Sequence, residues 1–443
     1  MEAMNEVRRF LVPGAQKTRG EGGGLLPALG LTLKENPMNM RAQVLPAPVI
    51  KAAGVSITNA AHWANSLGRA NFSVDANQAV KMNVAVFCHN SINGEAVYDK
   101  VRDIVNKLNA SYRFPKKPFK VISVGDNERH WGAVETHFSN TAKLPSNIFV
   151  IDFVRPRGQD LAYSVVKFIL AKGGYLSQFV NFKTCDHLRM RDERDEKKSA
   201  TILQGVARQI IHKCGGAIWW VSIPRSLPMP AMFVGVDVFH APRRYDPQTK
   251  TKVGKSSCAA IIVQVVRSHD PGSKIEFYSQ AFKRGTGEEY NLGPAVEETV
   301  KTGLKNIGVK PKSVVVWRDG VGDTSLEKTS KEEIAALRRA LKSGPKAAPV
   351  PLAYLFCQKR IAVKFLAQSG GYVSGPPTGT LIVGLEDLQF RTFYITGTAP
   401  KYATPKPVRY IIAQRDNALA NVPMTDLTWA LCHSYLNWTG PIK

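Results

Sequence analysis

The chain has 443 residues, a length that predicts two domains or slightly more. Its hydrophobic content of 44% and charged content of 21% are ordinary for a soluble globular protein. No apolar stretch reaches the ~18 residues that a membrane span requires, and the N-terminal "MEAMNEVRRF" lacks the apolar core of a secretory signal. Six scattered cysteines without a C-x-x-C pair predict reduced thiols in an intracellular protein and no zinc site.

Charge is the strongest global feature of the sequence. The 60 Lys and Arg residues outnumber the 35 Asp and Glu residues, which gives a net charge of +25. Such a field favours a polyanionic partner, most simply nucleic acid. The basic residues are spread along the chain, so they suit a long channel better than a tail. The alternative is a basic, solvated surface that has no partner.

The first 225 residues divide into two regions. Residues 1–80 are first Gly-rich and then contain short extended pieces with prolines, as in a linker. From residue 81, apolar strand patterns alternate with helical ones. The strands are "MNVAVFCHN", "KPFKVISV", "SNIFVIDFVRP" and "YLSQFVNF", and the helices are "GEAVYDKVRDIVNKLNA", "LAYSVVKFILAKGG" and "KKSATILQGVARQIIHKCGG". The alternation predicts an α/β fold with a parallel sheet covered by helices.

A second unit begins near residue 226. Three successive strands, "PAMFVGVDVFH", "SCAAIIVQVVRS" and "KIEFYSQAF", precede a helix at about 294–306 and the strand "KSVVVWRDG". The next helix is expected in "SKEEIAALRRALKSG", with Ser330 as its N-cap and Glu333 at capping-box spacing. Three antiparallel strands, a helix and a further strand follow the order of an RNase H-like sheet.

Two carboxylates carry the chemical argument. Asp237 lies inside a strong strand pattern, where an ionised group is costly unless it binds a metal or pairs with a cation. Asp319 ends the later strand, so neighbouring strands would direct both carboxylates to one point. Mg²⁺ favours such oxygens, and two ions about 4 Å apart can clamp a phosphodiester for hydrolysis. Ion pairs with Arg318 or with lysines are the alternative.

Several long stretches resemble landmarks of the Argonaute superfamily, most closely its Piwi branch. They are, in the family's order, "VGVDVFH", "VVVWRDGVGD", "KRIAVKFLAQSGG", "PPTGT" and "LTWALCHSYLNW". The likeness covers nearly all of residues 30–443. It implies a linker region at 1–80, a Rossmann-like MID domain at 81–225 and an RNase H-like Piwi domain at 226–443.

The resemblance implies a nuclease that cuts RNA opposite a guide strand, with an Asp-Glu-Asp-His catalytic set and Mg²⁺ or Mn²⁺ as cofactor. Asp237 and Asp319 match the two aspartates. The glutamate matches Glu289 in "GTGEEYNLG", with Glu288 as the near alternative. The family's His follows the "LCHSYLNW" stretch, whereas this chain stops at "GPIK". Three of the four catalytic residues are therefore expected here, without the last Piwi helices and without N-terminal and PAZ domains.

The resemblance also implies a pocket for the 5′-phosphate of the guide. The matching positions lie on two helices and the strand between them: Tyr163, Lys167, Gln178, Gln209 and Lys213. Residues at i and i+4 share one helix face. A tyrosine ring can stack on a base, lysines neutralise a phosphate and glutamines donate hydrogen bonds. The alternative is two ordinary amphipathic helices with solvated lysines.

Arg360 and Lys364 match family positions that contact the guide backbone. Two histidines, His240 and His433, are expected to be structural. The resemblance thus implies a small-RNA-guided silencing protein, cytoplasmic or also nuclear, whose partners are a guide RNA, a complementary target RNA and silencing cofactor proteins. The second hypothesis is a guide-RNA-binding protein that silences through recruited partners without cutting. The third is a different RNase H-like nuclease or recombinase that acts on DNA.

Overall fold

The computed structural model describes residues 40–52, 55–57, 80–89, 93–108, 112–124, 136, 148–154, 160–181, 193–239, 244–246, 248, 251–253, 257–272, 276–283, 292–342, 344, 347–369, 372–384, 390–398 and 404–442. The helices and strands below all lie in the unit Gln43–Lys443. Among the described residues, none of the helices combines the length and the apolar composition that a membrane crossing requires. Most of the predicted linker region, 1–80, lies outside the described residues.

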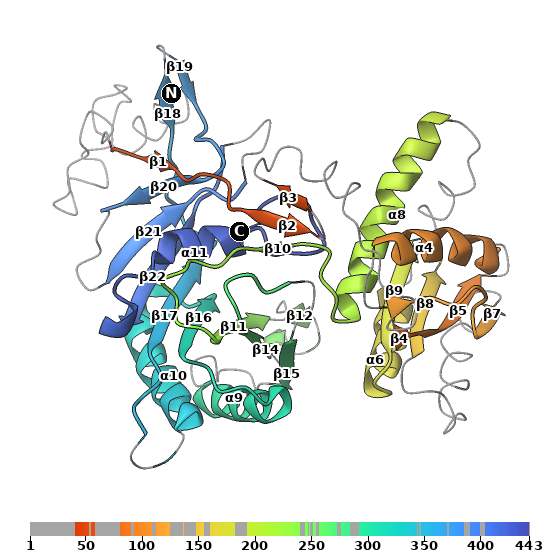
Figure 1. The fold of residues 1–443 in the computed structure, drawn as a ribbon, viewed down its shortest axis with the longest axis horizontal. Coiled ribbons are helices and arrows are strands. Elements are labelled where there is room, and N and C mark those ends of the chain that lie inside the picture. The colour runs from red at the N-terminus through yellow and green to blue at the C-terminus, as the bar shows by residue number, and fades with distance from the viewer. Residues whose placement is uncertain are drawn as a thin grey trace. The chain divides into compact units, whose positions relative to one another are not determined.

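A four-stranded parallel sheet forms the first half of the fold (Figure 1). Its order is β7-β5-β8-β9, with β5 at Asn83–His89, β7 at Lys120–Val124, β8 at Ile148–Val154 and β9 at Leu176–Asn181. Parallel strands need crossover connections, usually helices. Helix α4 (Gly94–Leu108) lies between β5 and β7, α6 (Asp160–Lys172) lies between β8 and β9, and α8 (Glu193–Lys213) follows the last strand. Helix α6 ends at Lys172, before the double glycine that predicts its stop, and Gly174 is left-handed with φ of 75°.

Helices cover both faces of this sheet. Alternate residues of β5 point to opposite sides because side chains in a strand have a period of two. Val84 and Val86 belong to the core that contains the buried faces of α4 and α8. Ala85 and Phe87 pack with Val166 of α6 on the other side. The three layers confirm the Rossmann-like fold that the sequence predicts.

A nine-stranded mixed sheet forms the second half. Its order is β1-β20-β21-β22-β17-β16-β11-β14-β15. The strands span, in that order, Gln43–Val44, Thr380–Val383, Arg391–Ile395, Val408–Arg415, Leu352–Gln358, Ser313–Asp319, Ala231–Phe239, Cys258–Val266 and Glu276–Lys283. Strands β11, β14 and β15 are antiparallel, whereas β16 and β17 continue the sheet in parallel with β11. This arrangement confirms the predicted RNase H-like sheet.

The residue alternation on β11 and β16 decides which side chains face the helices. Helices α9 (Gly293–Ile307) and α10 (Leu326–Leu341) pack on the face that carries Val236 and Val316. The opposite face carries Phe233 and Val315, in the core that includes helix α11 (Met424–Leu431). Asp237 lies four residues after Phe233, and Asp319 lies four residues after Val315. Since side chains of a strand alternate with a period of two, both carboxylates belong to the face away from α9 and α10.

The predicted start of α10 is wrong. The helix begins at Leu326, directly after a short 3₁₀ turn at Asp323–Ser325 that already starts the helical path. Ser330 therefore lies inside the helix, and its Oγ donates to the carbonyl of Glu327 at 2.9 Å. Glu333 is fully buried and serves an ion pair, described below, in place of a capping box.

Small elements complete the described fold. Short strands β2 (Ile50–Ala52), β3 (Val55–Ile57) and β10 (Trp220–Val221) form a three-stranded sheet. The other small sheets pair β4 (Val80–Lys81) with β6 (Tyr112–Arg113), β12 (Arg244–Asp246) with β13 (Thr251–Val253), and β18 (Ala367–Ser369) with β19 (Tyr372–Ser374).

Candidate functional site

Two of the predicted carboxylates meet at one edge of the nine-stranded sheet. Strands β11 and β16 are parallel neighbours, and Val236 pairs with Arg318 in their register. Asp237 and Asp319 are the next residues on the two strands, on the same face. Neighbouring strands lie about 4.8 Å apart, so the two side chains can reach one ion. The structure thus brings together the pair that the sequence predicts.

The surroundings of Asp237 differ from the prediction. The sequence places Asp237 in a buried strand, but the residue is exposed, because the end of β11 runs beyond the covered part of the sheet. Burial therefore imposes no cost that a metal must offset at this carboxylate. Asp319 is partly shielded, with 23% of its side chain exposed. The convergence of the two groups, and not their burial, supports a cation site.

A lysine lies beside this pair. The Nζ of Lys359, directly after β17, donates to Oδ2 of Asp319 at 2.6 Å. Burial lowers the pKa of Lys359, but the hydrogen bond that it donates to Asp319 and the negative charges of Asp319 and Asp237 outweigh burial and raise the pKa. The ammonium therefore lies in the field of both carboxylates, and the predicted alternative of a lysine ion pair is correct for Asp319.

Arg318 is not the partner of these carboxylate groups. Its guanidinium points to the opposite face, where Nε lies 3.1 Å from Oε1 of Glu333 and both side chains are buried. The hydroxyl of Tyr354 donates to the other oxygen of Glu333 at 2.5 Å, and burial raises the pKa of this tyrosine well above its usual value. Nη1 of Arg318 also donates to the backbone carbonyl of Asp319. The buried pair thus holds the end of β16 in place.

The residues at this edge fit a hard divalent cation. Carboxylate oxygens are the donors that Mg²⁺ and Mn²⁺ prefer, and the ammonium of Lys359 already places a positive charge against Asp319. In the part of the chain that the structure describes, no group of three His, Cys, Asp or Glu side chains gathers for a metal. Glu288, Glu289 and His240 lie outside the described residues.

A hollow of about 830 Å³ opens beside the carboxylates. Its walls include Asp237, Asp319 and the basic side chains Lys359, Arg360 and Arg409. Arg360 is exposed and lines the hollow, whereas Lys364 is exposed and is not part of this wall. Mixed charges of this kind suit a phosphodiester held next to a cation.

Three residues of this hollow are absent from the predicted site. Lys359 and Arg409 are basic wall residues, and Asp323 accepts hydrogen bonds from Arg409 at 3.0 Å and from Gln358 at 2.8 Å. The stretch "CQKR" at the end of a buried strand contains a local signal for Lys359. Cys357 pairs with Asp319 in the β16–β17 register, and Lys359 lies two residues later, so its side chain points to the same side as that of Cys357. Arg409 lies on β22, far along the chain, and has no such local signal.

The five predicted phosphate-pocket residues gather around β9. Nζ of Lys167, on α6, donates to the carbonyl and Oγ of Ser177 at 2.8 and 2.6 Å. Nζ of Lys213, at the end of α8, donates to the same carbonyl and to Oε1 of Gln178, both at 2.7 Å. Nε2 of Gln178 donates to Oε1 of Gln209 at 2.8 Å. Two lysines and two amides from three elements therefore form one connected cluster.

The electrostatics of this cluster favour an anion. Burial and the charge of Lys167 lower the pKa of Lys213 to about 8. Burial also lowers the pKa of Lys167. The hydrogen bonds described for both ammonium groups end on neutral oxygens, which do not cancel their charges. A phosphate dianion would supply that missing charge.

An aromatic group borders the cluster. Tyr163 lies one helical turn before Lys167 on α6 and is 46% exposed. Its ring meets the ring of Phe179 edge to face, with centroids 4.5 Å apart, and Nζ of Lys167 lies 5.5 Å from the same Phe179 ring. The exposed tyrosine is thus held next to the lysines, where a base could stack on it.

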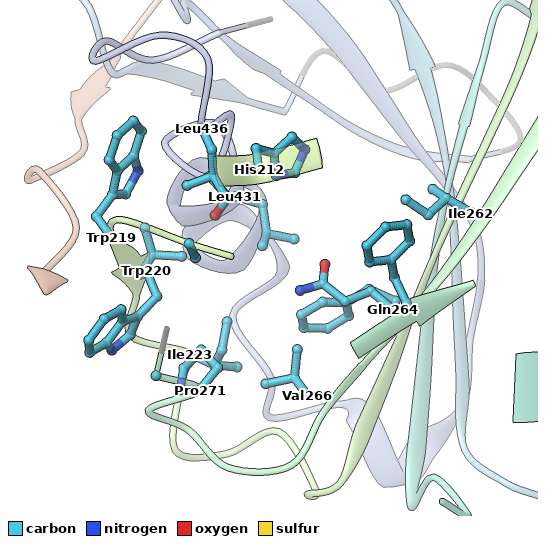
Figure 2. A pocket seen from close by; sticks show the side chains of 16 residues that line it. His212, Trp219, Trp220, Ile223, Ile262, Gln264, Val266, Pro271, Leu431 and Leu436 are labelled. Carbon is cyan, nitrogen blue, oxygen red and sulfur yellow. The ribbon is translucent and has the colours of Figure 1, made fainter. Parts of the chain in front are cut away.

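A second, smaller hollow of about 150 Å³ is mainly apolar (Figure 2). Side chains from Trp219, Ile223, Val266 and Leu436 form much of its wall, and Gln264 is among its few polar groups. Nothing in the sequence analysis predicts this hollow, because its wall comes from segments far apart in the chain. Its surface offers little to a phosphate.

His433 is a packed residue, as the sequence analysis expects. The side chain is buried, its ring meets the ring of Trp429 edge to face, and Nδ1 lies 3.0 Å from the carbonyl of Trp429. His433 is therefore committed to the packing of α11.

Comparisons with known proteins agree with this geometry. The Piwi domain family model matches residues 149–443. "Piwi-like protein 3" of Homo sapiens is 28% identical over 338 residues, which is 74% of this chain and 35% of that protein. The crystal structure of Drosophila Piwi matches with a TM-score of 0.70 at 19% identity, over 93% of this chain and 53% of that one. The crystal structure of Kluyveromyces polysporus Argonaute with a guide RNA matches with a TM-score of 0.64 at 20% identity, over 91% and 50%.

This chain spans 35% of the length of the human relative and about half of the two crystallised proteins. The low identities to the solved structures establish the fold alone. The family model, however, covers well over half of the chain, including β9 of the first sheet and every strand of the second sheet except β1. The chain therefore belongs to the Argonaute superfamily, in its Piwi branch.

Proposed function

We propose that this chain is the guide-binding and RNA-cleaving part of a small-RNA-guided silencing protein. Residues 81–225 would form the MID domain, which binds the 5′-phosphate of the guide, and residues 226–443 the Piwi domain, which cleaves complementary RNA. The convergence of Lys167 and Lys213 on Ser177 and Gln178 carries the proposal. Two half-buried cations whose hydrogen-bond partners are neutral raise the free energy of the pocket unless an anion joins them.

The pocket would hold the guide by its terminal phosphate. A terminal phosphate carries about −1.5 to −2 charges near neutral pH, which matches the two lysines. The amides of Gln178 and Gln209 can donate further hydrogen bonds, and the ring of Tyr163 can stack on the first base. Such contacts position the RNA without reading its sequence. Sequence would be read by pairing between the guide and its target.

The carboxylate edge would cleave the target. Asp237 and Asp319 would hold Mg²⁺ or Mn²⁺, with Glu289 as a further ligand. When bound, such an ion supplies the Lewis acidity that stabilises charge on a phosphodiester. The buried Arg318–Glu333 pair keeps the end of β16, and with it Asp319, in position. Arg360 and Arg409 face the hollow, where they can neutralise RNA phosphates.

A guide-binding protein that does not cut is the second candidate function. It is favoured by the ion pair between Lys359 and Asp319, which occupies one of the two carboxylates. Such a protein would use the same phosphate pocket and would silence through cofactor proteins. Guide binding is common to both functions, whereas target cleavage separates them.

A comparison of two guides tests the phosphate pocket. A single-stranded RNA with a 5′-phosphate is expected to bind at least about tenfold more tightly than the same RNA with a 5′-hydroxyl, because charge-assisted hydrogen bonds form only with the phosphate. Filter binding at fixed salt measures both dissociation constants, since salt weakens all phosphate contacts. Equal affinities for the two RNAs would contradict a 5′-phosphate pocket.

Guide binding is also expected to depend on pH through Lys213. The pKa of Lys213 in the free pocket is about 8, so this side chain loses its proton as the pH rises through that value. A bound phosphate favours the protonated form, so affinity should be nearly constant up to about pH 7, should be lower by about twofold at pH 8 and should fall by up to about tenfold per pH unit above that value. Lys213→Arg keeps its charge at all these pH values and should abolish the decline. A decline of the same slope in both proteins would exclude Lys213 as its source.

A further inference from the structure

The position of Lys359 has a consequence for metal binding at the carboxylate edge. Strands β11, β16 and β17 are three parallel neighbours that end at this edge. Asp319 pairs with Cys357 in the register of β16 and β17. Lys359 follows Cys357 by two residues, which is one full period of a strand. The topology therefore brings its ammonium to the same side as the two carboxylates.

The contact of Lys359 uses an atom that an ion would need. Its Nζ lies 2.6 Å from Oδ2 of Asp319, a distance typical of a strong charged hydrogen bond. Two carboxylates on adjacent strands repel each other, and the ammonium offsets that repulsion. A divalent cation would offset it too, through the same oxygen. The ammonium and the ion are thus alternatives at Asp319.

The side chain of Lys359 is free to leave. It is 43% exposed, and its Nζ makes no second hydrogen bond to any residue that the structure describes. Partly exposed ion pairs are individually weak, so a divalent ion can displace the ammonium of Lys359 at a small cost in free energy. By contrast, the buried Arg318–Glu333 pair cannot open without leaving an uncompensated charge. The edge thus combines one fixed pair with one exchangeable pair.

We propose that Lys359 is an internal counter-cation that occupies Asp319 in the ion-free protein and must leave it before a divalent ion binds. Lys359 then lowers the affinity of the site for the divalent ion, and it stabilises the protein when no ion is bound. This role rests on the proposed metal site at Asp237 and Asp319, and it means that Lys359 determines how tightly that site binds the ion.

Ion binding by the chain without RNA tests the inference. Calorimetric titration with Mn²⁺ would compare the wild-type protein with Lys359→Met, which keeps the long side chain and removes the charge. The variant is expected to bind Mn²⁺ about fivefold more tightly, a change that corresponds to the loss of one partly exposed ion pair. Lys359→Gln repeats the test with a neutral hydrogen-bond donor, and its affinity for Mn²⁺ should lie between those of the wild type and Lys359→Met.

Matched controls separate the lysine from its surroundings. Lys331→Met removes another surface lysine, which pairs with Glu327 on α10 at 2.7 Å, and should leave Mn²⁺ affinity unchanged. Asp319→Asn should weaken binding strongly, because it removes a ligand. Thermal unfolding adds a second measurement. In EDTA, Lys359→Met should have a lower melting temperature than the wild type, and Mn²⁺ should raise the melting temperature of the variant by more than that of the wild type.

Each outcome has a distinct meaning. Tighter Mn²⁺ binding by Lys359→Met, with unchanged affinity in Lys331→Met, supports the inference. If the wild type binds Mn²⁺ and Asp319→Asn does not, but Lys359→Met binds with unchanged or weaker affinity, the role of Lys359 is overturned and the metal site stands. If the wild type binds no Mn²⁺, or Asp319→Asn binds it equally well, the proposed metal site and the inference both fail.

Discussion

Replacing Asp319 by alanine is expected to reduce cleavage of a complementary RNA by on the order of 10³-fold or more, because the substitution removes a carboxylate that would hold the catalytic cation. The guide should still bind, since the phosphate pocket lies in the other sheet. The protein would be loaded with a 5′-phosphorylated guide and mixed with labelled target and Mg²⁺.

Asp323→Ala is the matched control for this experiment. Asp323 lies in the same hollow but pairs with Arg409 and Gln358, and it is not a proposed ligand. Its loss should leave most of the cleavage activity intact. A single cut in the wild type that persists in Asp319→Ala would refute the assignment of Asp319. Guide binding without any cut, in wild type and variants alike, would favour the non-cleaving function.

Replacing both pocket lysines by methionine, Lys167→Met with Lys213→Met, is expected to weaken binding of a 5′-phosphorylated guide by about 100-fold. The estimate assigns about 1.4 kcal/mol to each charged contact, which is the lower end for hydrogen bonds to charged groups. A guide with a 5′-hydroxyl should be affected far less, because it has no terminal phosphate to lose. The preference for phosphate, measured as a ratio of dissociation constants, should therefore disappear.

Lys172→Met supplies the control on the same helix. Lys172 ends α6, is exposed, and has no role in the cluster around β9. Its substitution removes one positive charge and should change both affinities by similar, small factors. The two single variants complete a double-mutant cycle, which measures the interaction free energy between two lysines that bond to the same carbonyl of Ser177. A double variant that retains the phosphate preference would show that the anion binds elsewhere.

Local patterns were sufficient for the elements of the first sheet. The strand β5 and the helices α4, α6 and α8 follow from apolar periodicity and from glycine stops, and both are properties of neighbouring residues. The start of α10 could not be found in this way. Ser330 has the sequence context of an N-cap, but the 3₁₀ turn at Asp323–Ser325, which follows the end of β16, starts the helix earlier.

The site shows the same division between local and long-range information. By itself, the sequence determined the order of strands and helices, the excess of positive charge, the family resemblance, and the pairs Tyr163–Lys167 and Gln209–Lys213 on their helix faces. Only the tertiary structure decided that Lys167 and Lys213 share the carbonyl of Ser177, that Asp237 is exposed, and that Lys359 lies against Asp319. Strand register and helix packing set these contacts, and both depend on residues distant in the chain, whose pairing no local period encodes.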